Sequence, residues 1–252
     1  MKRVTKEVLL SQLQQTSNQI ASDIDRDYFD DIDNIVTSLA ISYDILISII
    51  NHEDQTKISN ADFQSALLYF TALNTILGTL ELFRRGYSKE PQMLFRNAIE
   101  TMSAAYDIHA NPEKYTILMT TPDKFDSKKS ISVAKSVHSF IGQMYGLFSS
   151  NFSHVSPFHI LPHKSRGAEL CIGGLYDKNE KTHRLFTLSQ FIAISDVLGS
   201  LLELTFYEEL SIHRYWTYKE GGSFHYKPNL DSGGLQMADR LKEELDKKRV
   251  SV

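Results

Sequence analysis

The sequence predicts a mostly α-helical protein, a helical bundle of five to six long helices with a small β-hairpin insertion. Apolar residues recur at every third or fourth position over long stretches, which is the period of an amphipathic helix. Glycine and proline are scarce, at 12 and 6 of 252 residues, and they fall at the boundaries of these stretches. We therefore expect a helical bundle over residues 1–215, with the hairpin near 168–188, and a C-terminal tail over residues 216–252.

The first half of the chain is predicted to form four long helices. Apolar periodicity places them at Lys6–Ile24, Asp31–Asn51, Asn60–Arg85 and Ser88–His109. Gly86 supplies a C-cap for the third helix, because glycine adopts the left-handed conformation there without strain. Ser88 suits the N-cap of the fourth helix, and Asn111 followed by Pro112 ends it. A short helical piece is expected at Glu113–Met119.

The second half contains the predicted hairpin between two long helices. A helix should run from Ile131 to Val155, where Pro157 ends it. The segments AELCIGGLY and THRLFTL flank the polar DKNEK, and this pattern predicts two strands and their turn. A capping box, TLSQ from Thr187, opens a further apolar helix to Leu210. The last segment, ADRLKEELDKKR, predicts a short charged helix in a mobile tail.

Charge, cysteine content and hydropathy limit the class of protein. The net charge of −4 argues against a generally basic nucleic-acid-binding surface, although a local basic patch is compatible with it. Cys171 is the single cysteine, so no disulfide can form within the chain, and a cytoplasmic location is expected. The start of the chain lacks the apolar run of a signal peptide. The most apolar stretch, Ser38–Ile50, contains Asp44 and is shorter than the ~20 residues of a membrane span, which predicts a core helix and no membrane association.

Two patterns resemble metal-binding motifs but depart from them at necessary positions. The aspartates of Asp23–Asp33 begin with the spacing of a calcium loop, but Tyr28 replaces the required glycine and Asn34 the required glutamate. These aspartates are better explained as charges at helix ends. His159 and His163 are four residues apart, yet flanking prolines disfavour a helix and no glutamate lies between them. We expect no metal and no cofactor.

Polar residues on two predicted helices form the candidate functional site. Arg96, Glu100, Ser103 and Asp107 line up on one stripe, separate from the apolar face of their helix. A solvent-exposed ion pair between Arg96 and Glu100, four residues apart, is a structural alternative for those two residues. On the next long helix, His154 lies off the apolar face. A favourable position beside the unsatisfied carbonyls of a helix end is the alternative for His154.

Two segments, GYSKEPQMLFRNAIE (Gly86–Glu100) and YGLFSSNFSH (Tyr145–His154), carry a family resemblance. The first fits GY-x-x-E-x-x-x-L-x-R-x-x-x-E, and the second contains a tyrosine followed by the S-x-x-x-H spacing of Ser150 and His154. Together they resemble prokaryotic helical families of unassigned function, which are similar to the HEPN group. That group consists of α-bundle proteins and includes metal-independent RNases of toxin and antiviral systems. The resemblance covers roughly residues 60–156 and the later long helix.

In the nucleases of that group, an arginine and a histidine lie one to two turns apart on one helix, often beside another polar residue. Here Arg96 is followed by Asn97, whereas Thr101 and Met102 stand where the histidine would be. The resemblance therefore implies that His154 comes beside Arg96 from the neighbouring helix. Dimerisation brings two such sets of residues together in the group.

The chemistry that the resemblance implies is RNA cleavage by the RNA's own 2′-hydroxyl. This reaction needs a base for the hydroxyl proton, and histidine, with an unperturbed pKa of ~6.5, suits that role. It also needs a cation near the developing phosphorane charge, which suits arginine. The implied catalytic residues are Arg96, Glu100, which positions the arginine, and His154. The implied substrate-binding residues are Asn97, Tyr145, Ser150 and Asn151.

The expected function is that of a toxin or antiviral-defence protein, a metal-independent endoribonuclease that acts on RNA or binds nucleotide. The expected partners are an antitoxin or defence-system protein and a second copy of the chain. Leu82, Phe83 and the apolar stripes favour a homodimer, because together they present more apolar helix surface than one layer of helices would bury. The alternative is a non-catalytic helical module that binds a protein partner or a small ligand. A metal hydrolase is the third hypothesis.

Overall fold

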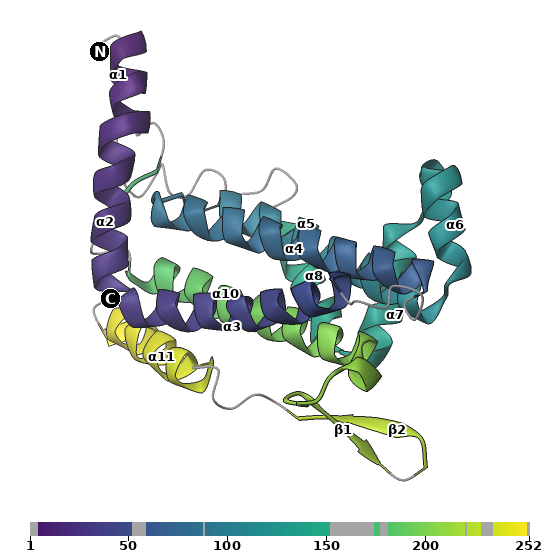
Figure 1. Ribbon diagram of the computed structural model, residues 1–252. Helices are drawn as coiled ribbons and strands as arrows, with labels where there is room; N and C mark the ends of the chain where they lie inside the picture. Colours follow the sequence, from purple (N-terminus) through teal and green to yellow (C-terminus); the bar gives the residue numbers. More distant parts are fainter. Residues whose placement is uncertain are drawn as a thin grey trace.

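The computed structural model describes residues 5–51, 59–87, 89–151, 174–176, 181–219, 221–227 and 234–250. Helices take up most of this part of the chain, and one two-stranded antiparallel sheet accompanies them (Figure 1). The predicted mostly α fold is confirmed. The described part of the chain contains more helices than the five to six expected, partly because one predicted helix is divided in two.

The chain begins with a long helix that projects from the bundle (Figure 1). It consists of α1 (Lys6–Ser11), a π-helical segment (Gln12–Thr16) and α2 (Ser17–Asp27), joined by residues with right-handed helical dihedral angles. Tyr28, with φ −131° and ψ 28°, ends this helix. The chain then turns into α3 (Phe29–Ile50), which runs along the bundle.

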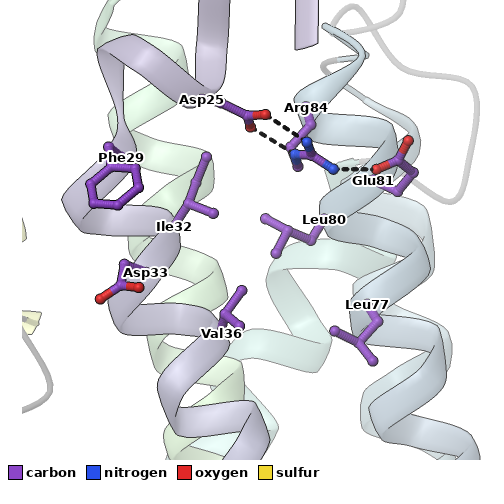
Figure 2. A pocket seen from close by; sticks show the side chains of 9 residues that line it. All are labelled: Asp25, Phe29, Ile32, Asp33, Val36, Leu77, Leu80, Glu81 and Arg84. Atoms are coloured by element: carbon purple, nitrogen blue, oxygen red, sulfur yellow. Dashed lines mark hydrogen bonds and ion pairs between the residues drawn. The ribbon is translucent and has the colours of Figure 1, made fainter. Parts of the chain in front are cut away.

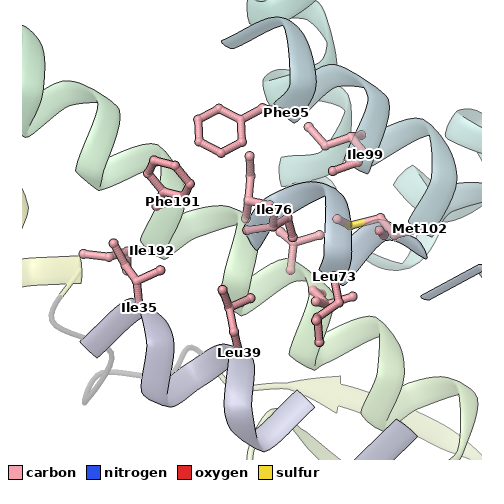
Figure 3. Close-up of a cluster of buried hydrophobic side chains, with 14 of the residues drawn as sticks. Ile35, Leu39, Leu73, Ile76, Phe95, Ile99, Met102, Phe191 and Ile192 are labelled. Atoms are coloured by element: carbon pink, nitrogen blue, oxygen red, sulfur yellow. The ribbon is translucent and has the colours of Figure 1, made fainter. Parts of the chain in front are cut away.

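The centre of the bundle is α10 (Lys181–Thr205), which packs against α3, α4 (Asn60–Arg84), α5 (Glu90–Ala110) and α11 (Gly234–Val250). Aromatic rings connect these layers. The ring centroid of Phe95 on α5 lies 4.6 Å from that of Phe191 on α10. Aliphatic side chains of α3 and α4, such as Leu39 and Ile76, extend this core (Figure 3).

Gly86 connects α4 to α5 and has the left-handed conformation predicted for it, with φ 80°. A Cβ atom there would lie 2.8 Å from the backbone nitrogen of Leu175. The N–H of Leu175 donates to the carbonyl of Gly86 at 3.0 Å, so another segment passes directly over this turn. The glycine of the GY motif therefore has a structural role in this chain.

The helix predicted at Ile131–Val155 is divided in the described residues into α7 (Ser127–Val137) and α8 (Phe140–Asn151). His138 interrupts it, with φ −135° and ψ 89°. The ring of His138 is buried 4.7 Å from that of Tyr226, so tertiary packing accompanies the break. The shorter elements are α6 (Glu113–Thr120) and the 3₁₀ turns Pro122–Lys124 and Tyr207–Glu209.

The hairpin lies outside the predicted region. β1 (Trp216–Lys219) pairs with β2 (Ser223–Tyr226), and Gly221 and Gly222 form the turn with φ of 111° and 85°. The predicted second strand, residues 182–188, belongs to α10 instead, because its leucines at 185 and 188 are buried on one helical face. Of the predicted first strand, residues 174–176 are not extended in a sheet, and residues 168–173 lie outside the described part of the chain.

The C-terminal segment packs on the bundle, so the expectation of a mobile tail is wrong for α11. Met237 of this helix is buried, and Arg240 Nη1 lies 2.5 Å from Asp31 Oδ1 on α3. Asp31 belongs to the aspartate-rich stretch that was interpreted as helix-end charge. That interpretation is incomplete, because two of these aspartates, Asp25 and Asp31, bind arginines on other helices.

By length and composition alone, α3, α4 and α10 could each cross a membrane. The bundle buries 78% of the most apolar window of α10 but only 28% of that of α3. The core helix expected at Ser38–Ile50 is therefore buried on one face, through residues such as Leu39 and Leu46, while Tyr43 is exposed. Phe83, which was expected to add to the exposed apolar surface, is buried against Phe191.

Candidate functional site

The structure places Arg96 of α5 beside Tyr145 of α8. The guanidinium donates from Nε to Glu100 Oε1 at 3.0 Å and from Nη2 to the Tyr145 hydroxyl at 3.4 Å. Its Cζ atom also lies 5.4 Å from the centroid of the tyrosine ring, within the range of a cation–π contact. The side chains of Arg96 and Glu100 are 26% and 25% exposed. The guanidinium is thus held on two sides and still accessible.

Core packing fixes this arrangement. Phe95 precedes Arg96 on α5, Phe148 lies nearly one turn beyond Tyr145 on α8, and their ring centroids are 5.5 Å apart. Both phenylalanines are fully buried. Because successive residues on a helix differ by about 100° in direction, a buried Phe95 leaves Arg96 at the edge of the interface with α8. Tyr145 meets it there.

The charge of Arg96 is maintained at this edge. Partial burial lowers the pKa of Arg96, but the hydrogen bond to Tyr145 and the negative charge of Glu100 outweigh that effect and raise the pKa above its usual value. A fixed cation with donors in a plane is suited to an anion with several oxygens, such as a phosphate.

Three further predicted residues, Asn97, Ser150 and Asn151, are not part of this contact. Asn97 is exposed next to Arg96 on α5. Ser150 is exposed and donates its hydroxyl hydrogen to the carbonyl of Gly146 at 2.8 Å, and Asn151 donates its amide to the carbonyl of Leu147 at 3.1 Å. Both donors are therefore engaged with their own helix. His154 lies outside the described residues, so its approach to Arg96 stays a prediction.

The other end of the polar stripe is a closed network around Asp107. This carboxylate is fully buried and accepts hydrogen bonds from Lys114 Nζ at 2.6 and 2.7 Å, from Ser130 at 2.7 Å and from Asn111 at 2.8 Å. The network joins α5 to the start of α6 and to α7. The stripe faces neighbouring helices along its length. Asp107 holds α6 and α7 against α5 through these hydrogen bonds.

An acid–histidine pair at the start of α4 was also not anticipated. A hydrogen bond of 2.7 Å joins His109 Nδ1 and Asp62 Oδ1, and Ser59 donates to the second carboxylate oxygen. The bond to His109 is the main cause that lowers the pKa of Asp62. Ser59 also caps α4, and a serine three residues before an aspartate was the sequence signal for this arrangement.

A groove between α3 and α4 is the second candidate site (Figure 2). Its cavity has a volume of about 470 Å³. Its walls are mostly apolar, with Asp33 exposed among them. One end is closed by Arg84, which donates to Asp25 at 2.5 and 2.7 Å and to Glu81 at 2.7 Å. The lining residues are Asp25, Phe29, Ile32, Asp33, Val36, Leu77, Leu80, Glu81 and Arg84.

In the part of the chain that the structure describes, no three histidine, cysteine, aspartate or glutamate side chains come together in a way that could hold a metal ion. His159, His163 and Cys171 lie outside that part. Comparison of the chain with protein-family models, with curated proteins and with solved structures gave no match.

Proposed function

We propose that the chain is a HEPN-like protein of toxin or antiviral-defence type that binds RNA at Arg96 and cleaves it without a metal. The observation that supports this is the guanidinium of Arg96, held by Glu100 and Tyr145 and still one quarter exposed. Such a cation can accept a phosphate without moving, and preorganised charge of this kind stabilises the transition state of phosphoryl transfer.

The proposed reaction is attack by a ribose 2′-hydroxyl on the adjacent phosphorus. His154 takes the hydroxyl proton while the new O–P bond forms, and Arg96 faces the non-bridging oxygens. The bond to the 5′-oxygen then breaks as that oxygen receives the proton held by His154, which leaves the histidine neutral again. The products are a 2′,3′-cyclic phosphate and a 5′-hydroxyl. His154 follows Asn151, the last residue of α8, by three residues, which span at most about 10 Å of extended chain.

The test is cleavage of a fluorescent RNA oligonucleotide by the purified full chain, with EDTA present throughout. Arg96→Ala and His154→Ala should each reduce the cleavage rate by roughly a hundredfold, because each removes a group that acts in the transition state. Tyr145→Phe retains the ring beneath Arg96 and should cost less. Arg26→Ala is the matched control, since Arg26 is also paired with carboxylates but lies on α2.

Two results would contradict the proposal. The first is a wild-type chain that neither binds nor cleaves a panel of single-stranded and structured RNAs. The second is activity that survives both substitutions at the site. If Arg96→Ala and His154→Ala instead lower the free energy of unfolding by ~1–3 kcal/mol, the pocket is structural and the group of residues has no catalytic role.

A second function is supported by the apolar groove between α3 and α4. Exposed apolar side chains such as Phe29 and Val36 line a concave surface there, which suits a non-catalytic module that binds a protein partner. RNA binding that depends on Arg96 favours the first function. Binding that depends only on Val36, with Arg96→Ala neutral, favours the second.

A further inference from the structure

The first eleven described helical residues, Lys6–Thr16, form an N-terminal arm with no buried residue. In Figure 1 the start of this arm stands clear of the other helices. Its apolar side chains are largely in solvent, with exposed fractions of 52% for Val8, 41% for Leu9, 41% for Leu10 and 59% for Leu13. A helix with this many exposed aliphatic residues presents a surface for another protein or for itself.

The arm cannot reach the groove of its own chain while its helix stays intact. The residues that join the arm to α2 have right-handed helical dihedral angles, and Ile20 and Ile24 anchor α2 in the core. A straight helix keeps Leu13 about 18 Å from Asp25, the α2 residue at the end of the groove. Any groove that the arm fills therefore belongs to another molecule.

The groove matches the apolar part of the arm in length. From Phe29 to Val36 along α3 the groove extends about 11 Å, and Val8–Leu13 of the arm spans about 8 Å. Phe29, Val36 and Leu77 line the groove with exposed apolar surface, at 66%, 43% and 39%.

The groove is acidic, and the arm begins with a basic residue. Three carboxylates and one guanidinium line the groove, and among the described residues Asp33 has no ion-pair partner. The arm itself contains Lys6 and Glu7, and two further basic residues, Lys2 and Arg3, precede it in the sequence. Lys6 at the start of the arm is exposed and likewise without an ion pair in the described part of the chain. The acidic groove disfavours anionic lipid as its occupant, because like charges repel. Anionic lipid surfaces instead attract basic segments.

We propose that the N-terminal arm of one copy lies in the α3–α4 groove of a second copy, and that the exchange is reciprocal. The result is a symmetric dimer with two identical arm–groove contacts, as a two-fold axis requires. Val8, Leu9 and Leu13 would cover Phe29, Val36 and Leu77, and Lys6 would approach Asp33. This assembly does not depend on RNA cleavage, since Arg96 takes no part in it.

The experiment measures the mass of the full chain by light scattering at micromolar concentration. The wild type should have twice the mass of the 28.8 kDa chain. The arm variant Leu9→Asp/Leu13→Asp and the groove variant Val36→Asp should each be monomeric, with an unchanged circular-dichroism spectrum because all three positions are exposed. The matched control is Ile212→Asp, which alters another exposed apolar residue, at 70%, and should stay dimeric.

Mixing the two monomeric variants distinguishes reciprocal exchange from other dimers. The groove of the arm variant and the arm of the groove variant are both intact, so native mass spectrometry should detect a heterodimer held by one contact. Contacts of arm with arm, or of groove with groove, would give no heterodimer. Lys6→Glu and Asp33→Lys test the same contact by charge, and each alone should weaken the dimer while their combination restores it.

Three results would overturn this inference: a monomeric wild type, a dimer that survives both variants, or the absence of a heterodimer on mixing. A wild-type monomer that sediments with phosphatidylglycerol vesicles, and loses this property in the arm variant, would assign the arm to a membrane surface instead.

Discussion

Helices α10 and α3 are both long and apolar, but the bundle buries them to different extents. Four helices pack around α10, and 78% of its most apolar window is buried. Helix α3 packs against α10 on one side and borders the open groove on another, and only 28% of its most apolar window is buried. Apolar composition therefore indicates that a helix must be covered, but it does not indicate whether the same chain or another molecule covers it. The chain itself covers α10, and we propose that a second copy covers α3.

The largest expected difference between the two helices comes from a matched pair of phenylalanines. Phe191→Ala on α10 should lower the free energy of unfolding by about 3–5 kcal/mol, because Phe191 is fully buried and packs against Phe95 and Phe83. Phe29→Ala on α3 should change it by less than about 0.5 kcal/mol. Urea unfolding at a concentration where monomers predominate measures both. Equal losses would show that α3 is as well covered as α10.

A pair of aspartates extends the comparison to polar groups. Asp107→Asn should cost about 1–3 kcal/mol, since Lys114 loses its partner and buried hydrogen bonds are impaired. Asp33→Asn should be close to neutral for unfolding of the monomer, because Asp33 is exposed at the groove. Thermal unfolding followed by circular dichroism compares the two. A neutral Asp107→Asn would mean that the network around α6 and α7 does not contribute to stability.

The smallest effect is expected from a glycine on the exposed side of α4. Gly78→Ala should stabilise the chain by about 0.5–1 kcal/mol, because Gly78 is mid-helix and an added Cβ has nothing within 4 Å. Gly86→Ala should act in the opposite sense, since it combines a φ of 80° with a clash against Leu175. The urea concentrations at the unfolding midpoints of the two variants show whether each substitution stabilises or destabilises the chain. A destabilising Gly78→Ala would place another molecule against this face.

The long helices could be predicted because their apolar period persists over many residues. The hairpin could not, because THRLFTL alternates over a window too short to reveal that the leucines at 185 and 188 continue a helical face through Phe191. The true strands flank a pair of glycines with positive φ, and that signal was present in the predicted tail. Aromatic residues on both sides of Gly221 and Gly222 were the better indicator.

The candidate site was predictable only where its contacts are local. The pairing of Arg96 with Glu100 follows from their spacing on one helix. The contact with Tyr145 depends on how α8 packs on α5 through Phe95 and Phe148, and the family resemblance suggested Tyr145 without that geometry. The network of Asp107 includes Ser130, 23 residues away, so no local pattern could predict it.

The ion pair between Arg240 and Asp31 joins residues 209 positions apart. A ribosome synthesises α3 and α10 before α11, so the surfaces that Met237 and Arg240 cover stay uncovered by α11 until that helix has been synthesised. Most of the bundle can assemble on the nascent chain, as early segments generally do. Emergence of α11 from the ribosome is thus the step that allows it to dock on α3 and α10.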